Sequence, residues 1–325
     1  MMIKCPECGN DISEYSAQCT HCGCPNSKYF SNDDDLVFEN RDEGLFIAGY
    51  SGDSINIVIP ESHAGKKIIG IGKNAFADKA ISSVKLLEGL KYIEDEAFIC
   101  CSGLSTVFFP KSLISIGKRA FYKCRLKEIK LFEGIQEIGD ESFGLCASLN
   151  KIEIPMSIIN IGAHAFKYTA WLIGQQKLNP LVAISNILID GTNAKGTVRL
   201  PSNVSKIAPS AFYSNPYIKN VVIPSNVKEI GAMAFADCVN LKTVDMEEGV
   251  ETIGRCAFIG ARSLSIVNIP NSVLYIGGAA FLRIDDLTVY CARSSKAVEW
   301  ASNWVDWRTL VTWNSKFPIS SFPFL

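Results

Sequence analysis

The feature that most constrains the fold is a hexapeptide, Ile-Gly-x-x-Ala-Phe, which recurs nine times as itself or as a near copy. Its phenylalanines are Phe76, Phe98, Phe121, Phe143, Phe166, Phe212, Phe235, Phe258 and Phe281. They follow one another at steps of 22 or 23 residues, apart from one step of 46, which is twice 23. A fixed period of this length is typical of stacked units that bury their apolar faces only against one another. The sequence therefore predicts a solenoid.

Each repeat also predicts two short strands. In the copy that starts at Phe235, Leu241, Val244 and Met246 indicate a strand with one inward face, and Val250 and Ile253 indicate a second. Either Glu-Gly or a proline separates the two strands. The prolines, each 12 residues after a repeat phenylalanine, are Pro110, Pro155, Pro224 and Pro270. Because proline donates no ladder hydrogen bond, it suits a corner.

A cysteine follows four of the repeat phenylalanines by three residues. These are Cys101, Cys124, Cys146 and Cys238. We expect them to stack as small buried hydrophobic residues, in preference to a metal or redox role. The combined pattern, I-G-x-x-A-F-x-x-C followed by L-x-x-V-x-I-P-x-S-V, resembles the BspA-type leucine-rich repeat over roughly residues 40–313.

That resemblance implies a mostly β, right-handed solenoid with two short strands per ~23-residue coil and few helical turns. It also implies an adhesion, ligand-binding or interaction role in place of catalysis, and many members of the family lie on cell surfaces. The regular pattern breaks once, at residues 167–200, where we expect an insertion of strands. This coil is either a tolerated structural variant or a binding element.

The N-terminal residues carry a separate motif, C-x2-C-x10-C-x2-C, with a glycine after each pair. Its cysteines are Cys5, Cys8, Cys19 and Cys22. Two such knuckles supply four thiolates in a tetrahedron, so they predict a small zinc ribbon that holds one structural zinc ion. Cys24 could replace Cys22 as a ligand, whereas His21 is expected to face solvent. A redox role for C-x2-C would require a βαβ setting, which this stretch lacks.

These motifs divide the chain into four segments. We expect a zinc-ribbon-like knuckle at 1–28, an acidic linker at 29–36, a capped repeat array at 37–313 and a tail at 314–325. The array should end in an aromatic C-terminal cap, since four of the five tryptophans fall near its end. They are Trp300, Trp304, Trp307 and Trp313.

The net charge of −1 favours neither nucleic acid nor an anionic membrane as a partner. We also see no secretory signal and no apolar run long enough to span a bilayer, so the sequence indicates a cytoplasmic protein. Nucleic-acid binding by the zinc module is not expected either, because acidic residues outnumber Lys4 and Lys28 in residues 1–30.

One outward column of the first strands suggests a contact surface. Its residues are Lys85, Phe108, Lys130, Glu153, Val222, Asp245 and Asn268. Phe108 is apolar on an otherwise polar stripe, and Ile114 follows on the next strand, so we predict an exposed apolar pair that contacts a protein. Lys85 and Lys130 flank it in the column.

No catalytic constellation and no small-molecule substrate is indicated by the sequence. The leading prediction is a non-enzymatic scaffold that binds a protein partner. The alternative is a surface adhesin or ligand-binding protein exported by a route that the sequence does not show. An enzyme would need a polar pocket with clustered titratable groups.

Overall fold

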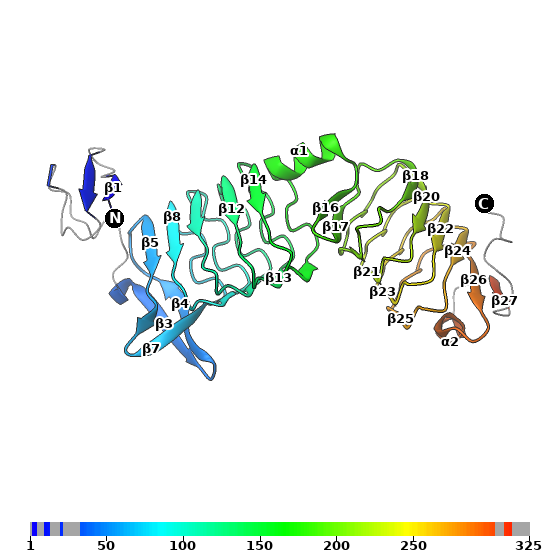
Figure 1. Cartoon of the computed structure of the whole chain (residues 1–325), viewed down its shortest axis with the longest axis horizontal. Helices are drawn as coiled ribbons and strands as arrows, with labels where there is room; N and C mark the ends of the chain where they lie inside the picture. Colours follow the sequence, from blue (N-terminus) through cyan, green and yellow to red (C-terminus); the bar gives the residue numbers. More distant parts are fainter. Residues whose placement is uncertain (1, 5–9, 14–19, 22–32, 303–308, 314–325) are drawn as a thin grey trace. The chain divides into compact units, whose positions relative to one another are not determined.

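The computed structural model describes residues 2–4, 10–13, 20–21, 33–302 and 309–313, and the chain forms two compact units, Met1–Gly174 and Gln175–Leu325. Within each unit the chain winds as a mostly β solenoid, as predicted (Figure 1). Every regular coil has a leading strand before the proline or Glu-Gly corner and a trailing strand after it. A turn that contains the repeat phenylalanine then connects to the next leading strand.

The strands of the first unit stack in parallel, coil on coil. Its leading strands are β5 (Asn56–Ile59), β8 (Ser83–Leu86), β10 (Thr106–Phe108), β12 (Glu128–Lys130) and β14 (Lys151–Glu153). Its trailing strands are β7 (Lys66–Ile71), β9 (Tyr92–Ile93), β11 (Ser115–Ile116), β13 (Glu137–Ile138) and β15 (Asn160–Ile161). The parallel register pairs equivalent residues of successive coils, for example Val84 with Val107 and Ile93 with Ile116.

A hairpin closes the N-terminal end of the trailing sheet. It consists of β3 (Leu36–Arg41) and β4 (Gly44–Tyr50), and β4 pairs in parallel with β7, which also carries β6 (Ser62–His63) at its side. The 3₁₀ turn Asp33–Asp35 leads into β3, and the Asp35 carbonyl accepts the Ser51 N–H at 2.8 Å. The end of the predicted acidic linker is therefore attached to the cap, while residues 29–32 lie outside the described part.

The second unit repeats this arrangement. Its leading strands are β18 (Gly196–Arg199), β20 (Ile218–Ile223), β22 (Thr243–Met246), β24 (Ile266–Asn268), β26 (Thr288–Ala292) and β27 (Thr309–Trp313). Its trailing strands are β17 (Ile187–Asp190), β19 (Lys206–Ile207), β21 (Glu229–Ile230), β23 (Thr252–Ile253) and β25 (Tyr275–Ile276), with β16 (Val182–Ile184) antiparallel to β17.

The irregular coil differs from the prediction. Its apolar residues do form the β16–β17 hairpin, but helix α1 (Ala170–Leu178) also lies within residues 167–200, where we expected strands alone. The cause is Thr169, which stands at the position that cysteine holds in other coils. Its Oγ accepts the Leu172 N–H at 3.1 Å, an N-cap that starts a helix.

A second helix, α2 (Lys296–Ser302), lies beside the last regular coil. It carries Trp300, whose ring meets the Phe281 ring edge-on with centroids 5.4 Å apart. Phe281 is the last phenylalanine of the repeat, so Trp300 covers the end of the aromatic column. Trp304 and Trp307 lie outside the described residues.

The repeat phenylalanines form a stacked column in each unit. All nine rings are at most 1% exposed. Neighbouring centroids lie 4.9–5.5 Å apart from Phe76 to Phe166 and 4.6–5.1 Å apart from Phe212 to Phe281. One ring per coil therefore fills the solenoid interior, as the sequence predicted.

Left-handed residues shape the turn around every repeat phenylalanine. The residue two before it and the residue two after it have φ between 51° and 71° in all nine coils, and Gly260 is the only glycine among them. This conformation turns alternate N–H groups toward the next coil. Those of Met233, Phe235 and Asp237, for example, reach the carbonyls of the following coil at 2.7–3.0 Å. The turn is thus a third hydrogen-bonded side of the coil.

The glycine of the Ile-Gly-x-x-Ala-Phe hexapeptide lies where there is no room for a side chain. A Cβ added at Gly254 would lie 2.5 Å from the backbone nitrogen of Ala232 in the preceding coil. Glycine at this position therefore permits the close backbone approach between successive coils.

The two kinds of corner interlock where they meet. The Glu88 carboxylate accepts the N–H groups of Lys111 and Ser112 at 2.9 and 3.2 Å, and Gly89 N–H binds the Ser112 hydroxyl at 2.8 Å. Glu248 and Gly249 make the same contacts with the Pro270 corner. A Glu-Gly coil and a Pro-x-Ser coil are therefore complementary neighbours.

Candidate binding sites on the repeat surface

The predicted outward column exists in the first unit. Lys85 and Phe108 are direct register partners on β8 and β10, and Lys130 and Glu153 are partners on β12 and β14. Phe108 is 58% exposed, whereas Val107 beside it is buried. Alternation along a strand whose other face is buried places Phe108 outward. An exposed aromatic side chain on a sheet face is a candidate contact point.

The column is not uniformly charged. Lys130 Nζ lies 3.3 Å from a Glu153 carboxylate oxygen and 5.9 Å from the centre of the Phe132 ring. Lys85 is exposed and forms no ion pair with any residue in the described ranges. Lys85 is therefore available to a partner, while Lys130 already shares its charge with Glu153.

Of the two apolar residues that we expected to be exposed, Phe108 and Ile114, only Phe108 is exposed. Ile114 directly precedes β11, in the sheet of trailing strands, and its side chain is half-buried. Its backbone N–H donates to the Lys91 carbonyl of the preceding coil at 2.8 Å. Phe108 and Ile114 thus belong to different sides of the coil, and this part of the prediction is corrected.

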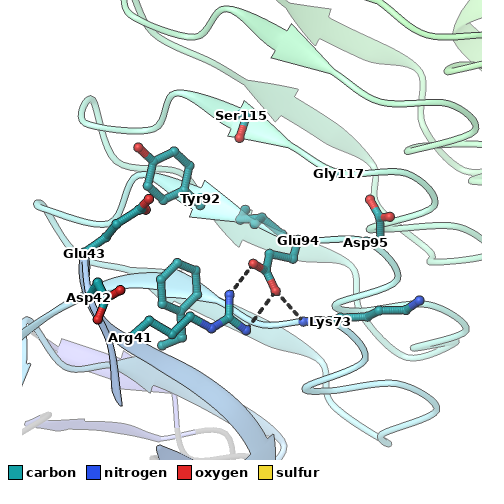
Figure 2. Close-up of a pocket in the computed structure, with 11 residues that line it drawn as sticks. Arg41, Asp42, Glu43, Lys73, Tyr92, Glu94, Asp95, Ser115 and Gly117 are labelled. Atoms are coloured by element: carbon teal, nitrogen blue, oxygen red, sulfur yellow. Dashed lines mark hydrogen bonds and ion pairs between the residues drawn. The ribbon is translucent and has the colours of Figure 1, made fainter. Parts of the chain in front are cut away.

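A separate hollow of about 650 Å³ opens beside the N-terminal hairpin (Figure 2). The guanidinium group of Arg41 lies over the Phe46 ring, 4.1 Å from its centre, and donates to the Glu94 carboxylate at 2.5 and 3.3 Å. Gly70 lies under the same ring. A Cβ at this position would collide with the Phe46 side chain, so the close contact requires glycine. Tyr92 lines the hollow, with its ring 6.3 Å from Phe46.

Three of the six charged side chains that line the hollow, those of Arg41, Glu94 and Asp95, have partners within the chain. Hydrogen bonds from Arg41 to Glu94 and Glu39 raise the guanidinium pKa further above its ordinary value. Glu94 also accepts the Lys73 N–H at 3.0 Å, and Asp95 accepts the Lys118 N–H at 2.7 Å. The lining includes no histidine or cysteine, so within it we find neither a nucleophile–base pair nor a soft metal site.

The hollow was not predicted, although the sequence holds a signal for it. Seven of the nine repeat motifs have glycine after isoleucine, one has Ala208, and one has Glu94. A carboxylate at a position built for glycine indicates a local contact. Its partner, Arg41, is 53 residues away in a hairpin without the repeat pattern.

The four cysteines Cys5, Cys8, Cys19 and Cys22 lie outside the described residues, as do Cys24 and residues 29–32 of the predicted linker. The strands on either side of the first pair are described. β1 (Met2–Lys4) and β2 (Asp11–Ser13) are antiparallel, with Lys4 opposite Asp11. The part of the chain searched, which excludes these cysteines, contains no metal-binding cluster.

Comparison with known families decides what this solenoid is. The BspA type leucine-rich repeat region matches residues 69–187 and 177–288, with six copies of the repeat. The chain belongs to the BspA-type leucine-rich repeat family. No curated protein matches it significantly.

Several solved structures match most of this chain at low sequence identity. A leucine-rich cell surface protein from Faecalibacterium prausnitzii is 20% identical, with a TM-score of 0.39, over 88% of this chain and 95% of that one. A leucine-rich repeat protein from Bacteroides ovatus is 19% identical, with a TM-score of 0.37, over 86% of this chain and 99% of that one. The pneumococcal vaccine antigen PcpA is 15% identical, with a TM-score of 0.40, over 86% of this chain and 99% of that one. Likenesses of this strength do not extend these proteins' properties to this chain.

Proposed function

We propose that this BspA-type repeat protein is a non-enzymatic scaffold that binds a protein partner through the leading strands of its first unit. The observation that carries the proposal is Phe108, which is 58% exposed in a unit whose repeat phenylalanines are fully buried. An exposed aromatic ring flanked by lysines supplies both apolar area and orientation to a partner. Membership of a repeat family supports a scaffold role, because stacked repeats present extended binding surfaces.

The experiment is a cross-linking pull-down from the native lysate with the full-length protein as bait, read by mass spectrometry. The bait is compared with Phe108→Ser and with Tyr275→Ser. Tyr275, in the second unit, is also 58% exposed, so this variant removes an equally accessible aromatic ring elsewhere. We expect a partner that is lost with Phe108→Ser and retained with Tyr275→Ser. A partner lost equally from both variants, or from neither, contradicts a site at Phe108.

We further propose that residues 1–28 hold one structural zinc ion through Cys5, Cys8, Cys19 and Cys22. The antiparallel pairing of β1 and β2, which precede and follow Cys5 and Cys8 in the sequence, supports this. Four thiolates would close the coordination sphere, so the ion would stabilise the module without activating water.

A cytoplasmic location is part of the same proposal. Seven cysteines of the described part are free thiols, including the adjacent Cys100 and Cys101, which favours a reducing compartment. No helix in the described ranges is long and apolar enough to cross a membrane. Surface biotinylation of intact cells, followed by fractionation, is the test. Labelling of this protein on intact cells would instead support the adhesin alternative.

A further inference from the structure

One coil of the first unit has an unusual charge. Residues 116–137 contain six basic and three acidic residues. The coils on either side are acidic, since residues 93–115 and 138–160 each contain three acidic residues and one lysine. The structure allows the charges of this basic coil to be divided into those with partners inside the chain and those without.

Two basic residues of the coil are paired with the next coil. Arg119 pairs with Glu141, and Lys130 pairs with Glu153 at 3.3 Å. Glu128 of the basic coil is in turn bound by Lys151 at 3.5 Å. These contacts hold the coil to its neighbour. The remaining basic residues of the coil are Lys118 and a row of three others.

The row consists of Lys123, Arg125 and Lys127. All three are exposed, and none forms an ion pair with any residue that the structure describes. Cys124 and Leu126 between them are buried. The alternation of exposed and buried residues places the three cations on the surface, with Lys123 in the left-handed turn (φ 61°) and Arg125 and Lys127 between this turn and β12.

The backbone of the row pairs with uncharged residues of the neighbouring coils. Its backbone hydrogen-bonds to the preceding coil, from Arg125 N–H to the Leu104 carbonyl and from Lys127 N–H to the Ser105 carbonyl, at 2.9 and 3.4 Å. On the following coil the Lys127 carbonyl accepts the Asn150 N–H at 3.0 Å. The adjacent carboxylate, Glu128, is paired with Lys151, so the three like charges repel one another without an ion-pair partner in the described chain, and an anionic partner would stabilise them.

The row is also continuous with the aromatic contact point. The same preceding coil that binds Arg125 and Lys127 continues into β10, which carries Phe108. Lys85 lies on the other side of Phe108 in the column. Cations without ion-pair partners therefore lie on both coils that neighbour the coil of Phe108.

We propose that the basic row Lys123–Arg125–Lys127 binds an acidic segment of the partner protein, with an apolar side chain of that segment against Phe108. An extended peptide presents alternate side chains on one face, roughly 7 Å apart, so it can place several carboxylates along the row. Glutamate or aspartate at alternate positions therefore matches the three cations. This inference rests on the proposed function, and it specifies the chemistry of the partner.

A protein segment fits this surface better than a nucleic acid does. Glu128 directly follows the row, and Glu153 lies in the neighbouring strand, so a uniformly anionic phosphate chain would meet carboxylates. A peptide can place a basic or neutral residue there. Complementary charges of both signs also fix the register of a bound segment.

The test uses the full-length protein and a short fluorescein-labelled peptide with glutamate at alternate positions and one leucine, read by fluorescence anisotropy. The test variant is Lys123→Glu/Arg125→Glu/Lys127→Glu. The matched control is Lys219→Glu/Lys242→Glu/Arg262→Glu, which reverses two exposed lysines and one exposed arginine in the second unit. The two variants have the same net charge, and equal circular dichroism spectra and melting temperatures show that both are folded.

We expect peptide binding that weakens with added salt, since surface charges are screened over about 10 Å at 0.1 M. The test variant should lose about tenfold or more in affinity, and the control should stay within about twofold. Phe108→Ser should weaken the leucine-containing peptide and leave a peptide with serine in place of leucine unchanged. Absence of peptide binding, or equal losses in the two triple variants, overturns the proposal.

Two further outcomes separate this inference from the proposed function. Tighter binding of a labelled single-stranded oligonucleotide than of the peptide would make the row a nucleic-acid surface and overturn the inference. If the lysate partner is lost with Phe108→Ser but retained by the triple variant of the row, the scaffold proposal stands and the acidic-segment inference fails. If neither variant loses a partner, both fail.

Discussion

The thiol of Cys124 donates a hydrogen bond to the carbonyl oxygen of Phe98, 3.2 Å away in the preceding coil. Cys101 and Cys146 make the same bond to Phe76 and Phe121 at 2.9 and 3.0 Å. The column cysteines therefore do more than fill volume, because each adds a second hydrogen bond to a buried carbonyl that already accepts a backbone N–H within its own turn.

Burial should make these thiols unreactive. It raises the pKa of Cys101, Cys146 and Cys238 to about 12. At pH 8 we expect no labelling of these thiols by iodoacetamide in the native protein and full labelling in urea, as followed by peptide mass spectrometry. Cys100 is only partly buried and serves as the internal comparison. Equal native labelling of Cys100 and Cys101 would contradict the burial of the column.

The same raised pKa values predict a pH dependence of stability. An unfolded thiol ionises near pH 8.5, whereas a thiol with a folded pKa of about 12 does not. The folded state therefore binds more protons above pH 8.5, and the free energy of unfolding falls as the pH rises from there toward 12. Cys146→Ser removes one such group. We expect its stability deficit relative to the wild type, measured by urea unfolding, to narrow between pH 8 and pH 10; a constant deficit would contradict this.

Removal of one stacked ring should destabilise the array strongly. Phe235→Ala empties a fully buried position between two parallel rings, so we expect a loss of about 3–5 kcal/mol in the free energy of unfolding. Phe108→Ala, at a 58% exposed position, should change it by less than about 0.5 kcal/mol. Urea unfolding followed by circular dichroism measures both. Losses of similar size would mean that Phe235 is not a core residue.

The period of the phenylalanines was enough to predict the solenoid, because one apolar ring per coil can only be buried by stacking. The spacing of Cys101 and of the corner prolines correctly placed the buried column and the strand ends. These features follow from residue type and distance along the chain, and they need no knowledge of which coils pair.

What the sequence did not show depends on contacts between coils. Leu145 and Cys256 adopt left-handed φ angles although neither is glycine, since hydrogen bonds to the next coil hold them there. Helix α1 begins because Thr169 replaces a column cysteine. The hollow depends on Arg41 meeting Glu94 across 53 residues. The pattern of residues along the sequence does not show which residues of different coils meet.

At the left-handed positions of the turns, we expect glycine to stabilise the protein more than alanine, the reverse of the usual order. Tyr168 has φ of 63° and is exposed. Because a Cβ in this conformation costs roughly 1–2 kcal/mol, we expect Tyr168→Gly to be more stable than Tyr168→Ala by about 1 kcal/mol. Both variants lose the contact with Lys167 equally. At Val239, which is also exposed but lacks a positive φ, alanine should be the more stable. Thermal melts of the four variants test this, and a preference for alanine at both sites would refute it.

The zinc module should bind metal and fold independently of the repeats. Cys5→Ser/Cys19→Ser removes one thiolate from each proposed knuckle, so we expect the bound zinc, measured by plasma mass spectrometry, to fall from one ion per chain to none. The repeat cores consist of residues outside this segment, for example the cluster from Leu188 to Ala297. The melting temperature of the array should therefore stay unchanged.

Matched variants decide the ligand set. Cys24→Ser and His21→Ala alter the two nearest competing ligands, and both should retain one zinc ion per chain. Loss of zinc from Cys24→Ser with retention in Cys22→Ser would assign the fourth ligand to Cys24. Unchanged zinc content in the Cys5→Ser/Cys19→Ser protein would refute the proposed site altogether. A fall in the array's melting temperature in that protein would show that the module packs on the repeats and that zinc stabilises both.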